Sequence, residues 1–342
     1  MASNIPRTQT TILVAGLGRF YGAAFRLTSQ LKPLENDANI VLIKDNDLRR
    51  IVSAHGGDSS YFGRESDRGY GYYAWKPILI AHYAQCCDYL IYIDAGSDVN
   101  PFSLRRLVSW FQQQSDTDLC LARTGHSIAD YTADWVIQYF GQDVSALKKV
   151  EMLAATIVFL KTSSGCTSIF HQASLLAYRN PDLYSGIRTH SDVSTPDVET
   201  HRHDQSLINL LLLKSRYLNR VRAFDTSFTP NSHKDLLFDG LPAIIAGRNC
   251  YSVSMYWPLM LLGVSAWYFP FSVFPRLLGN LIERARIYKV AILINKTADL
   301  IFSAMYQMLG PGTTTVIIPL PVPQLLGVAP NNQRDLAVDL HE

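Results

Sequence analysis

Several features that define common protein classes are missing from this sequence. Its basic residues form no run and its formal net charge is only +2, whereas nucleic-acid binding needs concentrated positive charge. We therefore expect no nucleic-acid partner. No two of the five cysteines have C-x-x-C spacing, and their number is odd, so the sequence suggests neither a zinc site nor a disulfide framework. With 48% hydrophobic and 18% charged residues, it is not a disordered chain.

The N-terminal residues 1–11 lack the basic segment and the long apolar segment of a signal peptide. We therefore expect a cytoplasmic protein whose cysteines stay reduced. There is no internal repeat, and 342 residues suffice for one large α/β domain or for one domain with an appendage.

Apolar β-type runs alternate with helical patterns along the first third of the chain. This alternation is typical of a parallel sheet with helical crossovers. The pattern predicts strands at 11–15, 39–43, 89–93, 118–122 and 153–160, and helices at 21–31, 48–54, 77–86, 101–114, 132–140, 167–178 and 204–214. Residues 180–200 are polar and predict a loop.

The strand at Tyr89–Ile93 is followed by Asp94-Ala95-Gly96-Ser97-Asp98. Open α/β sheets bind their ligands at the carboxyl ends of such strands. Carboxylates there can hold Mg²⁺ or Mn²⁺ and so neutralise a departing diphosphate. The alternative is an ordinary turn, which also favours Asp and Gly.

Trp75-Lys76-Pro77 precedes a predicted helix. A lysine at a helix start can reach a phosphate, which the helix N-terminus also attracts, and Trp75 could line a sugar or a base. The alternative is an ordinary packed helix start.

His203-Asp204-Gln205-Ser206 opens a helix so apolar, at 207–213, that it must be buried. Its polar start must then face solvent or a site. Asp204 and Gln205 can bind acceptor hydroxyls, and Asp204 can act as a base. The alternative is that Asp204 or Ser206 caps the helix.

Gly16, Gly18 and Gly22 follow the first strand, and Asp45 follows the second. This arrangement imitates a dinucleotide-binding fingerprint, which leaves an NAD(P)-dependent oxidoreductase as an alternative. The glycine spacing departs from G-x-G-x-x-G, and no Tyr-x-x-x-Lys pair or comparable catalytic set accompanies it. The same glycines would serve any first loop that passes close to a nucleotide.

Residues 256–275 carry no charge and have roughly the length that spans a bilayer, but prolines interrupt them. The basic amphipathic segment that follows, at 276–309, fits docking at a membrane surface. A buried core or an oligomer surface is the alternative.

Three blocks, at 69–77, 89–100 and 201–210, resemble a family of bacterial glycosyltransferase-like proteins often found with surface-polysaccharide genes. The resemblance implies a GT-A-like α/β fold, that is, a Rossmann-like nucleotide-diphospho-sugar transferase domain, at 8–248. A hydrophobic, mostly helical extension would follow at 249–342. It implies transfer of a sugar from a nucleotide-diphosphate donor to a glycan or lipid-linked acceptor. From the N-terminal residues and the segments at 256–309, we expect this reaction in the cytoplasm or peripherally on the membrane's cytoplasmic face.

The motifs described above and this resemblance together imply roles for individual residues, and the resemblance itself bears on Asp94, Asp98, Asp204, Gln205 and His233. Donor binding falls to Gly16, Gly18, Arg19, Asp45, Trp75, Lys76, Asp94, Ala95 and Gly96; catalysis or acceptor orientation to His203, Asp204 and Gln205; and Mn²⁺ or Mg²⁺ binding to Asp94, Asp98 and His233. Where the family pattern has Asp-x-Asp, this chain has Gly96 at the third position and its next acid at Asp98. Metal dependence is therefore open, and a catalytically inactive nucleotide-sugar-binding module is a further alternative.

Overall fold

The structure is a computed structural model that describes residues 8–55, 57, 69–187, 201–224, 226–228, 234–238, 241–246 and 320–321. His233, the uncharged stretch 256–275 and nearly all of the predicted extension 249–342 lie outside these residues. The predicted division into a domain and an extension therefore stays a prediction.

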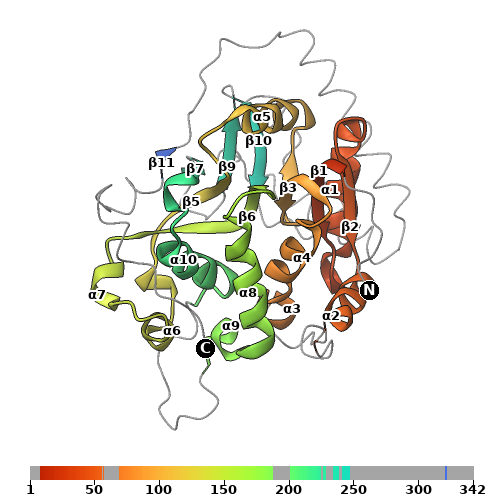
Figure 1. The fold of residues 1–342 in the computed structure, drawn as a ribbon. Helices are drawn as coiled ribbons and strands as arrows, with labels where there is room; N and C mark the ends of the chain where they lie inside the picture. The colour runs from red at the N-terminus through yellow and green to blue at the C-terminus, as the bar shows by residue number, and fades with distance from the viewer. Residues whose placement is uncertain are drawn as a thin grey trace, which may run out of the picture.

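The core of the fold is a seven-stranded sheet with the order β11-β7-β5-β6-β3-β1-β2 (Figure 1). β1 is parallel to both β2 and β3, and β5 is parallel to β7, while β6 runs antiparallel to β3 and β5. The strands are β1 (Thr8–Ala15), β2 (Asn39–Ile43), β3 (Cys87–Ile93), β5 (Leu119–Ser127), β6 (Glu151–Lys161), β7 (Val221–Phe224) and β11 (Leu320–Pro321).

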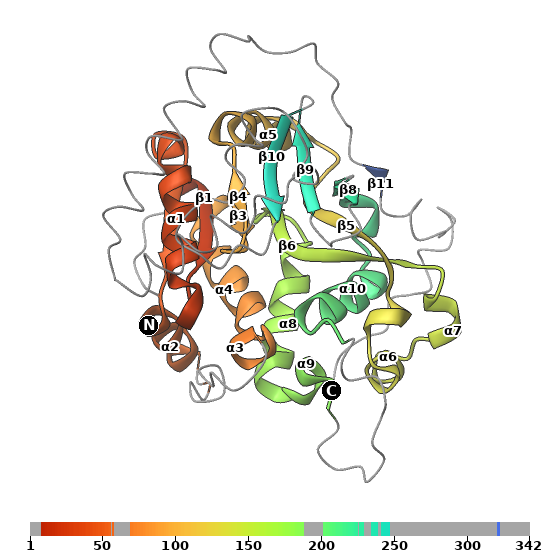
Figure 2. The ribbon, with the colours of Figure 1, turned by 180° about the vertical axis from the view of Figure 1, so that it is seen from behind.

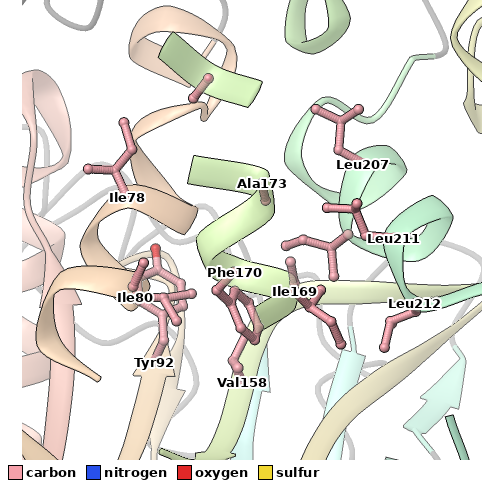
Figure 3. Packing of buried hydrophobic residues seen from close by; sticks show 14 of the residues in the cluster. Ile78, Ile80, Tyr92, Val158, Ile169, Phe170, Ala173, Leu207, Leu211 and Leu212 are labelled. Atoms are coloured by element: carbon pink, nitrogen blue, oxygen red, sulfur yellow. The ribbon is translucent and has the colours of Figure 1, made fainter. Parts of the chain in front are cut away.

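Helices cover both faces of this sheet, and each face has its own hydrophobic cluster. Helices α2 (Asp45–Ala54), α4 (Trp75–Tyr83), α8 (Thr167–Arg179) and α10 (Asp204–Lys214) pack on one face. Figure 3 shows apolar side chains of α4, α8 and α10 on this face, together with Tyr92 of β3 and Val158 of β6. Helices α1 (Tyr21–Leu31) and α5 (Pro101–Gln113) pack on the other. The short elements are η1 (Gly18–Phe20), η2 (Lys32–Leu34), α3 (Gly69–Tyr72), η4 (Ala129–Tyr131), α6 (Asp134–Tyr139), α7 (Val144–Leu147), α9 (Asp182–Ser185) and η5 (Leu218–Arg220).

A second, four-stranded sheet of order β4-β10-β9-β8 packs beside α5, as both ribbon views show (Figures 1 and 2). Its strands are β4 (Asp98–Val99), β8 (Thr226–Phe228), β9 (Lys234–Phe238) and β10 (Leu241–Ala246). β4 directly follows the turn at the end of β3, so this sheet helps to fix that turn.

The structure confirms a mixed α/β fold, and the predicted bounds of α1, β2 and α10 agree with it. The parallel arrangement predicted for the first strands is confirmed for β1, β2 and β3, whereas β6, whose direction was not predicted, runs antiparallel to β3. A buried apolar run shows that a strand is covered on both faces, and it does not show the strand's direction. The predicted loop at 180–200 contains the short helix α9, and neither β7 nor the second sheet was predicted.

The order of the first strands reverses direction at β1. The chain leaves β1 through α1 and reaches β2 on one side, then returns to β3 on the other side of β1. Such a topological switch point is where open α/β sheets bind ligands, outside the carboxyl ends of the strands. Because the register pairs Ala15 with Ile43 and Leu13 with Tyr92, the residues that follow β1, β2 and β3 lie along one edge.

Across the described ranges, we find no helix that combines the length and the apolar character that crossing a bilayer requires.

Candidate functional site

The centre of the candidate site is a cluster of three charged side chains at this edge. The ammonium nitrogen of Lys76 lies 3.0 Å from Asp94 Oδ1 and 3.0 Å from Asp204 Oδ2. It also donates to the carbonyl oxygen of Ala155 on β6, at 3.3 Å. Three separately predicted motifs thus supply one cluster: the Trp-Lys-Pro helix start, the end of β3 and the start of α10.

Each member of the cluster is held by an element of the core. Lys76 stands in the first turn of α4, which packs over β3, and Asp94 follows β3, with its backbone N–H donating to Thr156 on β6. Asp204 is the first residue of α10. That helix is tied to β6 by Asn209, whose amide exchanges hydrogen bonds of 2.8 and 2.7 Å with the backbone of Leu153.

Exposure differs sharply within the cluster. The side chains of Lys76 and Asp204 are 2% and 4% exposed, whereas that of Asp94 is 27% exposed. Asp94 is therefore the member that can meet a ligand directly. Lys76 was predicted to reach a diphosphate, but its ammonium is covered and faces three protein oxygens. We therefore revise its role to holding the two carboxylates in place.

The charges of the cluster shift its protonation equilibria. Burial raises the pKa of Asp204 to about 6; the Lys76 ammonium opposes this rise and Asp94 adds to it. Burial alone would lower the pKa of Lys76, but Asp204 and Asp94 together raise it above its ordinary value. Lys76 is thus charged throughout the physiological range, while Asp204 titrates close to neutrality.

Tyr92 fixes the orientation of Asp94 from within β3. Its hydroxyl donates to Asp94 Oδ1 at 2.7 Å, and its ring lies 5.2 Å below the Lys76 ammonium. Burial, followed by the charge of Asp94, raises the pKa of Tyr92 well above its ordinary value, so the phenol stays a donor. One Asp94 oxygen is thus occupied by Tyr92 and Lys76, and the sequence signal for this is the aromatic residue two positions before the acid.

Backbone strain is concentrated beside the cluster. Among the described residues, the non-glycine residues with positive φ are Tyr72 (54°), Tyr73 (58°) and His203 (53°). Gly71, at φ 85°, precedes the two tyrosines, so three consecutive residues are left-handed. This conformation costs a residue with a Cβ roughly 1–2 kcal/mol, and such strain clusters at functional sites.

The segment His201-Arg202-His203 is clamped to the backbone of α9. Ala133 donates its N–H to His201 Nδ1, so His201 Nε2 carries the proton and donates to the Leu183 carbonyl, at 3.0 Å. His203 Nδ1 donates to the Tyr184 carbonyl at 2.7 Å. His203 is 4% exposed, so its ring is not presented to an acceptor as predicted. Its contact with Tyr184 instead positions the start of α10.

Ser206 does not cap α10, because its hydroxyl donates to the carbonyl of Tyr131 at 2.9 Å. The Asp204 carboxylate reaches Lys76. Gln205 is partly exposed at the same helix start, which keeps it available to a ligand.

Asp98 is placed differently from its prediction as a metal ligand. It is 0% exposed, lies 3.2 Å from Arg26 Nε and accepts a 2.8 Å hydrogen bond from Gln30. Arg26 also donates to the carbonyls of Ala95 and Ser97, so this buried ion pair shapes the turn after β3. The signal in the sequence was a polar pair, Arg26 and Gln30, on the buried stripe of α1.

Within the part of the chain that the structure describes, no three His, Cys, Asp or Glu side chains come together in a way that could hold a metal ion. Asp94, partly exposed, fits the single carboxylate through which Mg²⁺ often binds alongside substrate phosphates. Asp98 does not fit, because its carboxylate is buried against Arg26.

The first loop lies beside the cluster along the sheet edge. Gly16 allows close packing of β1 on α1, since an added Cβ would stand 2.6 Å from that of Ala24. Gly18 donates its N–H to the two oxygens of Asp45 at 3.1 and 3.3 Å. Arg19, which follows Gly18, and Lys44, which precedes Asp45, are both exposed. Lys44, which directly follows β2, was not predicted as a site residue.

Three further predicted donor-binding residues differ in exposure. Trp75, the first residue of α4, is 6% exposed and packs in the core, so its indole is not presented to a sugar or a base as predicted. Ala95 is also buried, whereas Gly96 is partly exposed beside Asp94.

No protein-family model matches this sequence, and no curated protein matches it. Among solved structures, mouse xyloside xylosyltransferase 1 in its apo form is 12% identical, with a TM-score of 0.38 over 64% of this chain and 85% of that one. The apo form of the glycosyltransferase GlyE from Streptococcus pneumoniae TIGR4 is 13% identical, with a TM-score of 0.37 over 90% of this chain and 66% of that one. A glycosyltransferase involved in glycosylating the major capsid of PBCV-1 is 11% identical, with a TM-score of 0.30 over 51% and 68% of the two chains. These neighbours are glycosyltransferases, but at such identities and TM-scores the likeness identifies no family for this chain.

Proposed function

We propose that this protein is a glycosyltransferase that moves a sugar from a nucleotide-diphosphate donor to a glycan or lipid-linked acceptor. The observation that carries the proposal is the cluster of Lys76, Asp94 and Asp204 at the switch point of the sheet. Burying a lysine that contacts two carboxylates, each at 3.0 Å, carries a large desolvation cost. Its place at the switch point of the sheet gives that cost a functional reason.

The nucleotide end of the donor would lie along the loops after β1 and β2. Asp45, already held by Gly18, would accept hydrogen bonds from ribose or base. Arg19 follows Gly18 and Lys44 precedes Asp45 in the sequence, and both are exposed cations that can neutralise the diphosphate in place of Lys76. The N-terminus of α1, which has no acidic residue in its first turn, adds a favourable field for an anion.

The sugar end would meet Asp94. Because Tyr92 and Lys76 occupy its Oδ1, its Oδ2 is the oxygen directed to substrate. If Mn²⁺ or Mg²⁺ takes part, Asp94 would hold it and the cation would offset the charge of the departing diphosphate. The buried Asp204 carboxylate would keep Lys76 protonated, and Lys76 would in turn hold Asp94 in place. Gln205, which is partly exposed, would bind the acceptor.

The dinucleotide-binding alternative has a specific difficulty. In that fingerprint the backbone of the glycine loop approaches the pyrophosphate. Here the Gly18 N–H is already committed to Asp45, so the loop offers one donor fewer to a pyrophosphate.

The setting of the reaction is proposed from the sequence pattern alone. The apolar and basic character of 256–309 would bring the enzyme to a membrane surface, where a lipid-linked acceptor for surface polysaccharide would be found.

The test is release of nucleoside diphosphate from a panel of UDP-, GDP- and CDP-sugars, with and without Mn²⁺ and a mixture of simple glycosides as acceptors. We expect release from one donor class and a loss of at least about a hundredfold in Asp94→Asn, the size of a well-placed catalytic or electrostatic contact. The matched control is Asp134→Asn, which alters an exposed aspartate of α6 and should leave release unchanged. Binding of a donor with no release or transfer would instead identify an inactive binding module.

A further inference from the structure

Arg26, a buried arginine of α1, holds the turn after β3 through several contacts at once. Its guanidinium donates to the carbonyl oxygens of Ala95 and Ser97, at 3.1 and 2.7 Å. Its Nε lies 3.2 Å from Asp98 Oδ1. The turn is also closed on itself, because the N–H of Ser97 donates to the Asp94 carbonyl at 3.0 Å. The proposed reaction uses Asp94 and gives Arg26 no part.

Gln30, one helical turn further along α1, completes this support. Its Nε2 donates to Asp98 Oδ1 at 2.8 Å, and its Oε1 accepts from the N–H of Val99 at 3.1 Å. The side chains of Arg26 and Asp98 are both 0% exposed. Two side chains of one helix thus hold four consecutive residues of the turn and of β4, from 95 to 99 with the exception of 96.

The carbonyl contacts fix the direction in which the peptide groups of the turn point. A trans peptide is planar, with its C=O and its N–H on opposite sides. Because the Ala95 carbonyl is directed to Arg26, the N–H of Gly96 in the same peptide is directed away from α1. That helix covers one face of the sheet, whereas the Asp94 carboxylate meets Lys76 of α4 on the other face. The Gly96 N–H is therefore directed to the side on which the Asp94 carboxylate lies.

Gly96 is also the open part of the turn. It is partly exposed, whereas Ala95 and Ser97 are buried. Among the residues that the structure describes, none accepts a hydrogen bond from its N–H. Two positions earlier in the same turn, the Asp94 side chain is 27% exposed. A donating N–H beside an accepting carboxylate suits a hydroxyl group, which accepts and donates at once.

We propose that Arg26 is a positioning residue for the proposed transfer. By holding the carbonyls of the turn, it directs the Gly96 N–H to a hydroxyl of the nucleotide-sugar, and Asp94 accepts from the same hydroxyl or from its neighbour. This inference rests on the proposed function and assigns a contact within the same site. The hydroxyl belongs either to the ribose or to the sugar that is transferred, and the two sources are separated by experiment.

The first measurement uses the wild-type full chain labelled with [15N]glycine, in which the Gly96 amide signal is assigned by its disappearance in Gly96→Ala. The UDP-, GDP- or CDP-sugar that the enzyme turns over is added, and separately its free nucleoside diphosphate. We expect the nucleotide-sugar to shift the Gly96 signal. A shift with both ligands identifies a ribose hydroxyl, and a shift with the nucleotide-sugar alone identifies the transferred sugar. An unmoved Gly96 signal at saturation, while other glycine signals shift, would overturn the inference.

The second measurement compares the kinetics of Arg26→Lys with those of a matched control. Lysine keeps a positive charge beside Asp98 but lacks the planar fork that reaches both carbonyls. Arg220→Lys makes the same change where Arg220 pairs with Asp118 and donates to the Ser115 carbonyl, each at 2.8 Å. These contacts precede β5 and β7, at the edge of the sheet opposite to the candidate site. Thermal unfolding of every variant checks that it folds.

We expect Arg26→Lys to lower kcat for release of nucleoside diphosphate about tenfold, while KM for the donor changes less than about threefold, because the turn acts in the transition state and the first loops bind the nucleotide. Arg26→Met combined with Asp98→Leu removes both buried charges and should show the same loss of kcat, whereas Arg220→Lys should match the wild type. A wild-type kcat in either folded Arg26 variant would show that the inference is wrong and leave the proposed function standing. If the wild type neither binds nor cleaves any of these donors, the proposed function fails first.

Discussion

Replacing Asp204 by Asn should remove a pH dependence of stability that the structure assigns to this one residue. Asn keeps the shape of the side chain and can still accept from Lys76, but it cannot ionise. Because burial raises the pKa of Asp204 from 3.8 to about 6, the folded protein holds this proton more tightly than the unfolded chain does.

The direction of the pH dependence of stability follows from this difference in pKa between the folded and unfolded states. Stability from Asp204 is fully present below pH 3.8 and is lost as the pH rises through about 6. The pKa of Lys76 is raised, so its own contribution is present below 10.5 and is lost only at more alkaline pH. A shift of about 2 pKa units corresponds to about 3 kcal/mol, and most of it, about 2 kcal/mol, falls between about pH 4 and pH 7.

The assay is urea unfolding of the wild type, Asp204→Asn and Asp134→Asn at several pH values in that window. The free energy of unfolding of the wild type minus that of Asp204→Asn should fall by about 2 kcal/mol from about pH 4 to pH 7. The difference for Asp134→Asn, at an exposed position, should stay flat. A flat difference for Asp204→Asn, or one that rises with pH, would refute the buried arrangement of the cluster.

Three other substitutions probe the packing that builds the site. Lys76→Met leaves the buried Asp204 carboxylate and the partly exposed Asp94 carboxylate without their cation and should lower the free energy of unfolding at pH 7 by about 3–5 kcal/mol; a urea-derived loss under about 1 kcal/mol would contradict this. Gly16→Ala places a Cβ 2.6 Å from that of Ala24 and should cost about 1–3 kcal/mol, seen as a lower midpoint in thermal unfolding; an unchanged midpoint would mean that β1 and α1 are less tightly packed. Arg26→Met removes the cation beside the buried Asp98 carboxylate and should lower the free energy of unfolding by about 3–5 kcal/mol. Combining Arg26→Met with Asp98→Leu should largely reverse this loss in the same unfolding assay.

The sequence predicted the elements of the site better than their arrangement. Lys76, Asp94 and Asp204 were each singled out, because each follows a pattern that ends or begins a buried element. Nothing local indicates that they meet, since α4, β3 and α10 are brought together by packing across β6. The prediction that Lys76 binds diphosphate therefore assumed an exposed ammonium that the structure does not have.

Asp98 is a second residue whose role depends on a contact that the sequence does not show. As a second acid after a glycine it suggests a metal ligand, and only the fold reveals that Arg26 of α1 lies against it. The left-handed turn at Gly71, Tyr72 and Tyr73 is also beyond prediction from propensity, because tyrosine disfavours that conformation. Tertiary contacts with His203 override the local preference.

The most direct test of the central claim is a thermal shift of the purified protein against UDP, GDP, CDP, their common sugars and NAD(P), each with and without Mn²⁺. A ligand at a hundredfold its dissociation constant stabilises by about 2.7 kcal/mol, which is readily measured. We predict stabilisation by one class of nucleoside diphosphate and its sugars, lost in Asp94→Asn and kept in Asp134→Asn. Stabilisation by NAD(P) alone would contradict the account and favour a dinucleotide-binding enzyme.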